Sequence, residues 1–266
     1  MSYVNGPTES LSKLVDHWLQ GHVASLSSYV KDTPHMLRTL QQWNHDYGPF
    51  RDGVRLVTID VIGLYTNIPH QDLLTALRFH LNSMPQTNIP PTERIVDIAN
   101  HVLSSNVFSF EDDYFQQIFG TVMGTPMAPS AANLLMGRLE AQLLASSPVP
   151  VSQDTWKCFI DDIFLLWTGT PEDLGVFFEH VNSFHPTITF TIAYSTDQQP
   201  FLDILISLKN GFLKTDIHSK PTDSHAYLPS SSCYPCHVVN NIPYSQFLRL
   251  RPVSYTHLTL PTSVYV

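Results

Sequence analysis

Three aspartates follow or interrupt apolar segments, where a rigid backbone could hold carboxylates for metal-dependent chemistry. Asp60 comes late in the β-branched run 54–65, and Asp161 and Asp162 lie between the two apolar flanks of 156–167. Two-metal nucleotidyl transfer uses Mg²⁺ ions about 3.5–4 Å apart, and such hard cations prefer carboxylate oxygens. Carboxylates gathered without cations would repel one another. A site that gathers these three side chains would therefore need two Mg²⁺ ions to neutralise them, with Mn²⁺ as an alternative.

The segments around these aspartates predict the elements that would position them. The run VRLVTIDVIGLY (54–65) predicts a buried strand that ends near Asp60, and WKCFIDDIFLLW (156–167) predicts a hairpin with the aspartate pair at its turn. A second hairpin is expected where the dipeptide Asn210-Gly211 separates FLDILISL from FLKTDIHS, because Asn-Gly favours the type I′ turn.

Further helices and strands complete the expected fold, read from apolar residues at helical spacing and from short apolar runs. The expected helices cover residues 8–30, 34–45, 70–82, 91–104, 128–144 and 171–183, and the expected strands cover 187–194 and two short stretches within 106–120. The turn between those two short strands carries Glu111, Asp112 and Asp113, which we expect to be solvated. These elements indicate an α+β fold in which helices back an antiparallel sheet.

Composition narrows the class of protein. The chain has 266 residues, of which 43% are hydrophobic, and this suffices for a sizeable core. No apolar run is long enough to span a membrane and no secretory signal begins the chain, so we expect an intracellular protein.

The odd cysteine count, from Cys158, Cys233 and Cys236, argues against a disulfide framework. With His237 the last two spell C-x-x-C-H, which we interpret as a coincidence because no second pair of zinc ligands and no export signal accompanies it.

Three segments, in their order and spacing, resemble the core polymerase motifs of Penelope-like retroelement reverse transcriptases. They are VTIDVIGLYTNIPH (57–70), GTVMGTPMAPSAANLLMGRLE (120–140) and FIDDIFLLW (159–167). Further matches are SYVKDTPHML (28–37), VNSFHPTITF (181–190), FLDILI (201–206), KPTD (220–223) and IPYSQFLRLR (242–251). Each aspartate alone is as typical of a cap or a turn, but the ordered set of motifs is specific.

The resemblance implies a right-hand polymerase palm that adds deoxynucleotides to a primer 3′-hydroxyl on an RNA template. By position, Asp60 and Asp161 resemble the metal ligands, and Asp162 resembles their less directly coordinating neighbour. Tyr65 resembles the aromatic residue that would collide with a 2′-hydroxyl and so select deoxynucleotides.

The resemblance also implies contacts to nucleotides and to the primer. These are Met123, Gly124 and Thr125 in the loop under the template and incoming base, and Phe201, Leu202 and Asp203 in the primer grip. In that loop a glycine lets the main chain approach closely. The implied partners are an RNA template, a DNA primer and deoxynucleoside triphosphates, without a membrane. Nuclear localisation follows from the habit of such elements of inserting into chromosomes.

A division of the chain follows from the same resemblance. Residues 1–53 would be the helical N-terminal part of the reverse transcriptase domain, with partial fingers material, and 54–223 the palm with the primer-grip hairpin. Residues 224–252 would begin the thumb connection, and 253–266 are interpreted as a non-native tail. The family's upstream fingers segments, thumb and GIY-YIG endonuclease are not matched, so we expect a chain cut at both ends, without DNA-nicking activity.

Two features depart from a nucleic-acid polymerase. The net charge is −9, and there is no Lys or Arg between Lys157 and Lys209, so a basic track must come from elsewhere in the fold. In addition, Thr189 stands where related sequences often have a lysine thought to protonate pyrophosphate, and only His180 and His185 remain nearby as protonatable groups.

Two alternative readings remain open on the sequence. One is another palm polymerase, either an RNA-dependent RNA polymerase, which Tyr65 disfavours, or a telomerase-type enzyme, disfavoured by the lack of a dedicated RNA-binding region. The other is a catalytically inactive fragment of a retroelement, kept at most as a binding domain.

Overall fold

The computed structural model describes residues 6–84, 89–122, 124–219, 228 and 233–250. The chain forms two compact units, each built from separate stretches of sequence. The first unit comprises Met1–Lys31 and Ile59–Ala193, and the second comprises Asp32–Thr58 and Tyr194–Val266. The functional division expected at 1–53, 54–223, 224–252 and 253–266 stays a prediction.

The first unit contains a sheet and the helices that cover it. The helices are α1 (Glu9–Ala24), α3 (Leu64–Asn67), α4 (His70–Ser83), α5 (Thr92–Ser104), α6 (Ala128–Ala145) and α7 (Pro171–Phe184). The sheet has the strand order β4–β5–β1–β6, formed by β4 (Trp156–Phe159), β5 (Asp162–Trp167), β1 (Arg55–Val61) and β6 (Phe190–Ser195), and residues 55–58 of β1 and 194–195 of β6 belong to the second unit. A separate hairpin pairs β2 (Val107–Phe110) with β3 (Asp113–Gln116). The acidic residues at its turn are exposed, which confirms the expectation for them.

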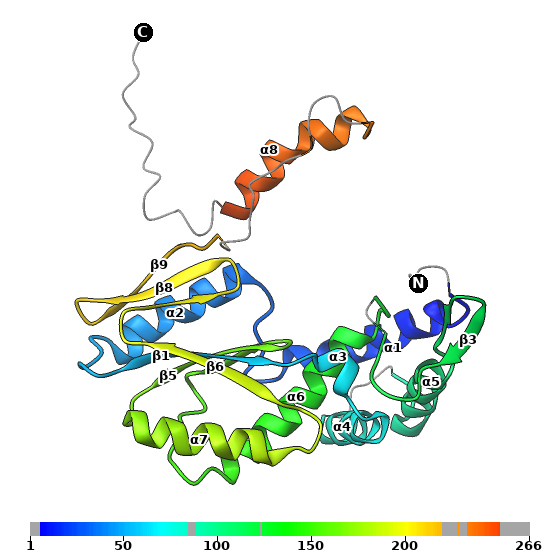
Figure 1. The fold of residues 1–266 in the computed structure, drawn as a ribbon, viewed down its shortest axis with the longest axis horizontal. Helices are drawn as coiled ribbons and strands as arrows, with labels where there is room; N and C mark the ends of the chain where they lie inside the picture. Colours follow the sequence, from blue (N-terminus) through cyan, green and yellow to red (C-terminus); the bar gives the residue numbers. More distant parts are fainter. Residues whose placement is uncertain (1–5, 85–88, 123, 220–227, 229–232, 251–266) are drawn as a thin grey trace. The chain divides into compact units, whose positions relative to one another are not determined.

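The core of the first unit surrounds α6. Leu134, Leu135 and Met136 are consecutive along α6 and all buried, so this part of the helix has no solvent-facing side. Helices α1 and α4 both pack on α6, and α5 packs on α1 and α4 (Figure 1). On the sheet, the indole rings of Trp156 and Trp167 lie 6.1 and 5.6 Å from the ring of Phe177 in α7. Burial of these aromatic rings fixes α7 against β4 and β5.

The second unit is a helix packed on a three-stranded meander. It contains α2 (Thr33–Tyr47), β7 (Gln198–Phe201), β8 (Ile204–Lys209), β9 (Phe212–Ile217) and α8 (Cys236–Leu250). The Asn44 side chain accepts from the amide of Leu213 at 2.7 Å and donates to its carbonyl at 2.8 Å, which ties α2 to β9 (Figure 1). Asn210 and Gly211 have φ of 54° and 77°, as a type I′ turn requires, so the hairpin predicted there is confirmed.

Two expected elements end earlier or break in the structure, and a third ends as predicted. The helix expected over 8–30 ends at Ala24, because the next residues pair with β4 instead: Val30 N donates to Cys158 O at 2.8 Å. The strand expected within 54–65 was predicted to end near Asp60, and β1 ends at Val61, which confirms the prediction; Gly63, with a φ of 57°, then starts the helical turn α3. The strand expected from residue 201 is interrupted at Leu202, whose φ of 54° belongs to the turn between β7 and β8.

Two expectations concern membranes and cysteines. Within the described ranges, no helix combines the length and apolarity that crossing a membrane requires. Cys158 is buried, and Cys233 and Cys236 are exposed, all three as free thiols. Among the described residues, no disulfide and no group of three metal-ligating side chains includes these cysteines, and the interpretation of C-x-x-C-H as a coincidence stays a prediction.

Glu140 is a carboxyl group inside the core of the first unit. The residue is 5% exposed, and its Oε1 has no hydrogen-bond partner among the described residues. Burial raises the pKa of Glu140, and the neighbouring side chains of Ser28, Cys158 and Trp156 offset this only in part. Burial likewise raises the pKa of the Cys158 thiol well above its usual value. This part of the core therefore favours uncharged side chains.

Replacing Glu140 by glutamine should change how stability depends on pH. A carboxyl whose pKa is raised by folding stabilises the protein only below that pKa, so its contribution is lost as the pH rises through it. Glu140→Gln should therefore gain stability relative to wild type between about pH 5 and about pH 8, by about 1.4 kcal/mol per unit of raised pKa. Urea unfolding at both pH values measures this.

The control is Glu179→Gln, which changes an exposed carboxyl on α7. It should leave the pH dependence of the unfolding free energy as in wild type. An equal gain in both variants, or none in Glu140→Gln, would contradict the assignment.

Candidate active site

The turn between β4 and β5 carries the aspartate pair. Phe159 pairs with Asp162 in the antiparallel register, so Ile160 and Asp161 form a two-residue turn. Ile160 has a φ of 60°, a strained conformation for a β-branched residue, of the kind that often marks functional sites. The side chains of Asp161 and Asp162 are both half-buried. The hairpin predicted from the sequence is confirmed, with Asp161 in the turn and Asp162 at the first position of β5.

Asp60 lies near the end of the neighbouring strand β1. Val61 N donates to Asp161 O at 3.0 Å, and Ile62 N donates to Thr189 O at 2.9 Å. These hydrogen bonds join the end of β1 to the aspartate turn on one side and to the segment before β6 on the other. Asp60 directly precedes Val61, whose amide donates to Asp161, and the Asp60 side chain is exposed.

The carboxylates at this end of the sheet suit Mg²⁺ without forming a complete cage. Among the residues that the structure describes, no three His, Cys, Asp or Glu side chains are grouped so as to hold a metal ion. Mg²⁺ is usually bound through one or two carboxylates, with waters and substrate phosphates as its other ligands. Asp60 and Asp161, on adjacent segments, fit that mode of binding, and the convergence of all three aspartates stays a prediction.

Tyr65 lies on α3, the short helical turn that follows β1. Its side chain is half-buried, and its pKa is raised first by burial and then by the negative charge of Asp161. The phenol therefore shares the electrostatic environment of the aspartate turn. The expected strand was predicted to end near Asp60, five residues earlier, and the structure places Tyr65 in the helical turn that follows.

Gly120 is a site residue that sequence reasoning missed. Its neighbour Thr121 donates its amide to the carbonyl of Tyr65 at 2.7 Å, and Gly120 N donates to Ile68 O at 2.9 Å. A Cβ on Gly120 would lie 2.6 Å from the carbonyl oxygen of Tyr65, and the residue has a φ of 74°. The ring of His70 lies 2.7 Å from the Gly120 carbonyl. The sequence did offer a signal for Gly120, because this glycine is the first residue of the second motif, in which Gly124 was assigned to the nucleotide-binding loop.

The expected nucleotide-binding loop is only partly described. Met123 lies outside the described residues. Gly124 has a φ of 96°, and a Cβ there would meet nothing within 4 Å, so the fold needs this glycine for its conformation and not for a close contact within the chain. Thr125 is buried, and its hydroxyl has no hydrogen-bond partner among the described residues. Their contact with a nucleotide stays a prediction.

Comparison with known proteins shows which solved structures share this fold. No protein-family model and no curated protein matches the chain. Solved structures do match: the telomerase of Candida albicans in complex with a fragment of telomeric RNA has a TM-score of 0.63 at 8% identity, covering 93% of this chain and 43% of that one. A truncated apo telomerase of Candida tropicalis gives 0.57 at 12% identity, covering 80% and 46%. An RNA-dependent RNA polymerase of a human picorbirnavirus, with an insertion loop deleted, gives 0.57 at 10% identity, covering 86% and 44%.

The fold is that of a polymerase palm. The expected fold class, an antiparallel sheet backed by helices in an α+β arrangement, is confirmed by these neighbours and by the antiparallel pairs of the structure. The chain spans less than half the length of each of these proteins.

A groove of about 580 Å³ opens beside the aspartate turn of the palm. Its lining includes Tyr29, Lys31, Asn133, Phe159 and Ile160. The first two belong to the matched segment SYVKDTPHML, to which sequence reasoning gave no role. The backbone pairing of this segment with β4 carries them to the turn, and the exposed Lys31 brings a positive charge there.

The expected primer-grip residues lie in the second unit, at the turn between β7 and β8. Phe201 is buried, and Asp203 accepts a hydrogen bond through its carbonyl from His218 N at 3.0 Å. Leu202 is half-buried at the turn itself. These residues thus shape a tight turn in the meander, and their contact with a primer stays a prediction.

The two histidines expected to lie near position 189 make polar contacts of their own. Both ring nitrogens of His185 make polar contacts, and only 11% of its side chain is exposed. His180 Nε2 lies 3.2 Å from the Ser146 hydroxyl and 3.3 Å from the Leu143 carbonyl, at the end of α6. Thr189 is exposed. A general acid at this position is therefore not supplied by either histidine in this conformation.

Substituting Gly120 should disturb the palm site more than substituting Gly124. Both residues have positive φ, so alanine is strained at either position, but only at Gly120 does it also meet backbone. We expect Gly120→Ala to destabilise the protein by about 1–3 kcal/mol more than Gly124→Ala. Thermal unfolding of the two variants measures the difference, and equal losses would show that the approach to Tyr65 is unimportant.

Proposed function

We propose that the chain is the palm region of a reverse transcriptase, an RNA-directed DNA polymerase that extends a primer 3′-hydroxyl with deoxynucleotides. The observation that carries this proposal is the hydrogen bond from Val61 to Asp161, which joins two segments bearing expected metal ligands within a palm fold. The order of the motifs supports a retroelement enzyme of the Penelope-like kind. We propose the nucleus as the place where this enzyme acts.

Asp60 and Asp161 would hold two Mg²⁺ ions, with Mn²⁺ as a substitute and Asp162 as a less direct ligand. When bound, the ions lower the pKa of the attacking hydroxyl and neutralise the charge of the triphosphate. The protein's part is to fix the carboxylates before substrate arrives, which the backbone bonds at the end of β1 would do.

Tyr65 would exclude ribonucleotides by occupying the space of the 2′-hydroxyl. Its helical turn is fixed from two sides, by the left-handed Gly63 and by the amide of Thr121. A fixed ring discriminates better than a mobile one, because a small displacement would admit an extra oxygen. This residue favours DNA synthesis over the RNA synthesis of the viral polymerases that share the fold.

The template–primer duplex would be held mainly through its backbone. The groove beside the aspartate turn offers aromatic surfaces at Tyr29 and Phe159 and a positive charge at Lys31, which suit bases and phosphates. The loop of Met123, Gly124 and Thr125 would lie under the template and incoming base. The turn of Phe201, Leu202 and Asp203 would contact the primer.

Primer extension tests the proposal directly. The chain is given an RNA template annealed to a DNA primer, the four deoxynucleotides, and Mg²⁺ or Mn²⁺. We expect incorporation by wild type and a loss of about 1,000-fold or more in Asp161→Asn, which keeps shape but removes the charge that binds metal. Asp97→Asn, at an exposed position of α5, should retain wild-type incorporation.

No incorporation by wild type with either metal, also after fusion to a related enzyme's fingers segments, would overturn the proposal. It would support the alternative of an inactive retroelement fragment. Equal incorporation by wild type and Asp161→Asn would remove the aspartate turn from the mechanism.

Restoring a lysine at position 189 should speed the chemical step. Thr189 is exposed, and its carbonyl bonds to Ile62 beside the end of β1, so a lysine there would bring an acid to that end of the sheet. We expect single-turnover incorporation to rise by about tenfold or more in Thr189→Lys. Thr191→Lys is the control, since it places the same charge two residues farther along the chain, within β6. No gain, or an equal gain in both, would dispose of the idea.

A further inference from the structure

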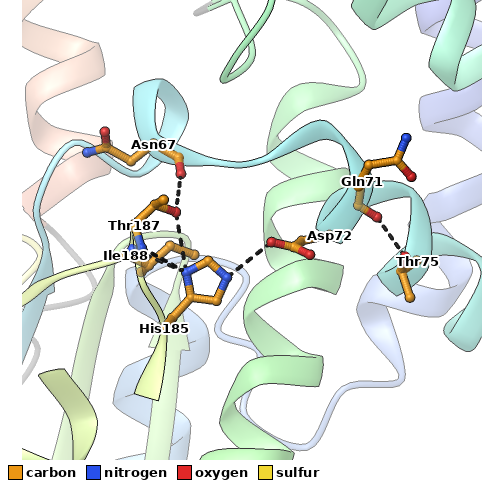
Figure 2. A network of polar contacts seen from close by, with 7 residues as sticks. All are labelled: Asn67, Gln71, Asp72, Thr75, His185, Thr187 and Ile188. Carbon is orange, nitrogen blue, oxygen red and sulfur yellow. Dashed lines mark hydrogen bonds and ion pairs between the residues drawn. The ribbon is translucent and has the colours of Figure 1, made fainter. Parts of the chain in front are cut away.

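His185 is the centre of a polar network that follows α7 (Figure 2). Its Nδ1 lies 3.3 Å from the amide nitrogens of Thr187 and Ile188 and from the Thr187 hydroxyl, and its Nε2 lies 3.2 Å from Asp72 Oδ2. A backbone N–H can only donate, so Nδ1 must accept and carry a lone pair. The proton of the neutral ring is then on Nε2, donated to Asp72 at the first turn of α4.

The residues that His185 organises are bonded to the segment bearing Tyr65. The Thr187 hydroxyl donates to the carbonyl of Asn67 at 2.9 Å, as Figure 2 shows. Two residues later, the carbonyl of Thr189 accepts from Ile62 N at 2.9 Å. The segment 62–67 is thus bonded at both ends to the chain that follows His185.

We propose that His185 is a positioning residue that fixes the place of Tyr65 and so sets the discrimination between deoxynucleotides and ribonucleotides. This inference rests on the proposed function. With Nδ1 removed, the amides of Thr187 and Ile188 lose their shared acceptor, and the loop can relax. The Thr187 hydroxyl, which donates to the Asn67 carbonyl, is then no longer held in place. His185 acts through Tyr65 and does not touch the reacting atoms.

Three substitutions separate the two nitrogens of the ring. His185→Asn keeps an acceptor near the place of Nδ1, and His185→Gln keeps a donor near the place of Nε2. His185→Phe keeps a flat ring with neither. We expect the ratio of kcat/KM for a deoxynucleotide to that for its ribonucleotide to fall about fivefold or more in the Phe and Gln variants. The Asn variant should restore most of the selectivity.

A double substitution tests whether His185 acts through Tyr65. Tyr65→Ala should lower the same ratio, and adding His185→Phe to it should lower the ratio no further, since the ring to be positioned is gone. His180→Phe, on α7 five residues before His185, is the control and should leave selectivity unchanged. A selectivity loss that adds fully to that of Tyr65→Ala would overturn the inference.

A second readout does not depend on catalysis. Burial and the charge of Asp161 raise the pKa of Tyr65, and NMR of ring-labelled tyrosine, assigned with Tyr65→Phe, can follow its titration. We expect the Tyr65 pKa to fall toward its ordinary value in His185→Phe and to stay raised in His185→Asn. An unchanged titration in His185→Phe overturns the inference even if the chain is inactive. Absence of primer extension by wild type, by contrast, counts against the proposed function alone.

Discussion

The register of β1 is the constraint on which the site depends. The hydrogen bond from Val61 to Asp161 places Asp60 beside the aspartate turn only in that register, because a slip of one residue would turn every side chain of the strand to the other face. The slip is prevented by burial: Ile59 and Val61 are almost fully buried, whereas Asp60 between them is exposed. Hydrophobic burial on one face of the strand therefore decides where a carboxylate lies on the other.

A second layer of contacts surrounds the residues that follow β1. The segment 62–67 is held by the amide of Thr121 on one side and by the residues after His185 on the other. Both sets of bonds use backbone groups of the segment, so they fix the main chain and leave the Tyr65 ring to project from it. A side chain fixed through its backbone in this way can act as a steric gate, because its displacement would break several hydrogen bonds at once.

Local signals in the sequence predicted local structure well. The Asn210-Gly211 turn and the hairpin around Asp161 were both predictable, because turn chemistry and flanking apolar runs act over a few residues. Elements decided by distant partners were not. The end of α1 depends on pairing with β4, and the closeness of Gly120 to Tyr65 depends on a loop far away in sequence. The order of the motifs predicted which residues form the site, and the hydrogen bond from Val61 to Asp161, which no local signal predicts, joins two of their segments.

The acidic composition does not conflict with binding to nucleic acid near this site. Exposed charges are screened over about 8–10 Å at moderate ionic strength, so phosphates respond to the charges nearest to them more than to the net charge of the chain. Lys157 does not serve this purpose, because its ammonium donates to the Ser27 carbonyl at 2.7 Å and burial lowers its pKa. Lys31 lies exposed at the groove beside the aspartate turn, where pairing with β4 places it, and Asp16 lines the same groove. The fold thus brings one lysine and one aspartate to this groove, a local balance that the net charge of −9 does not reveal.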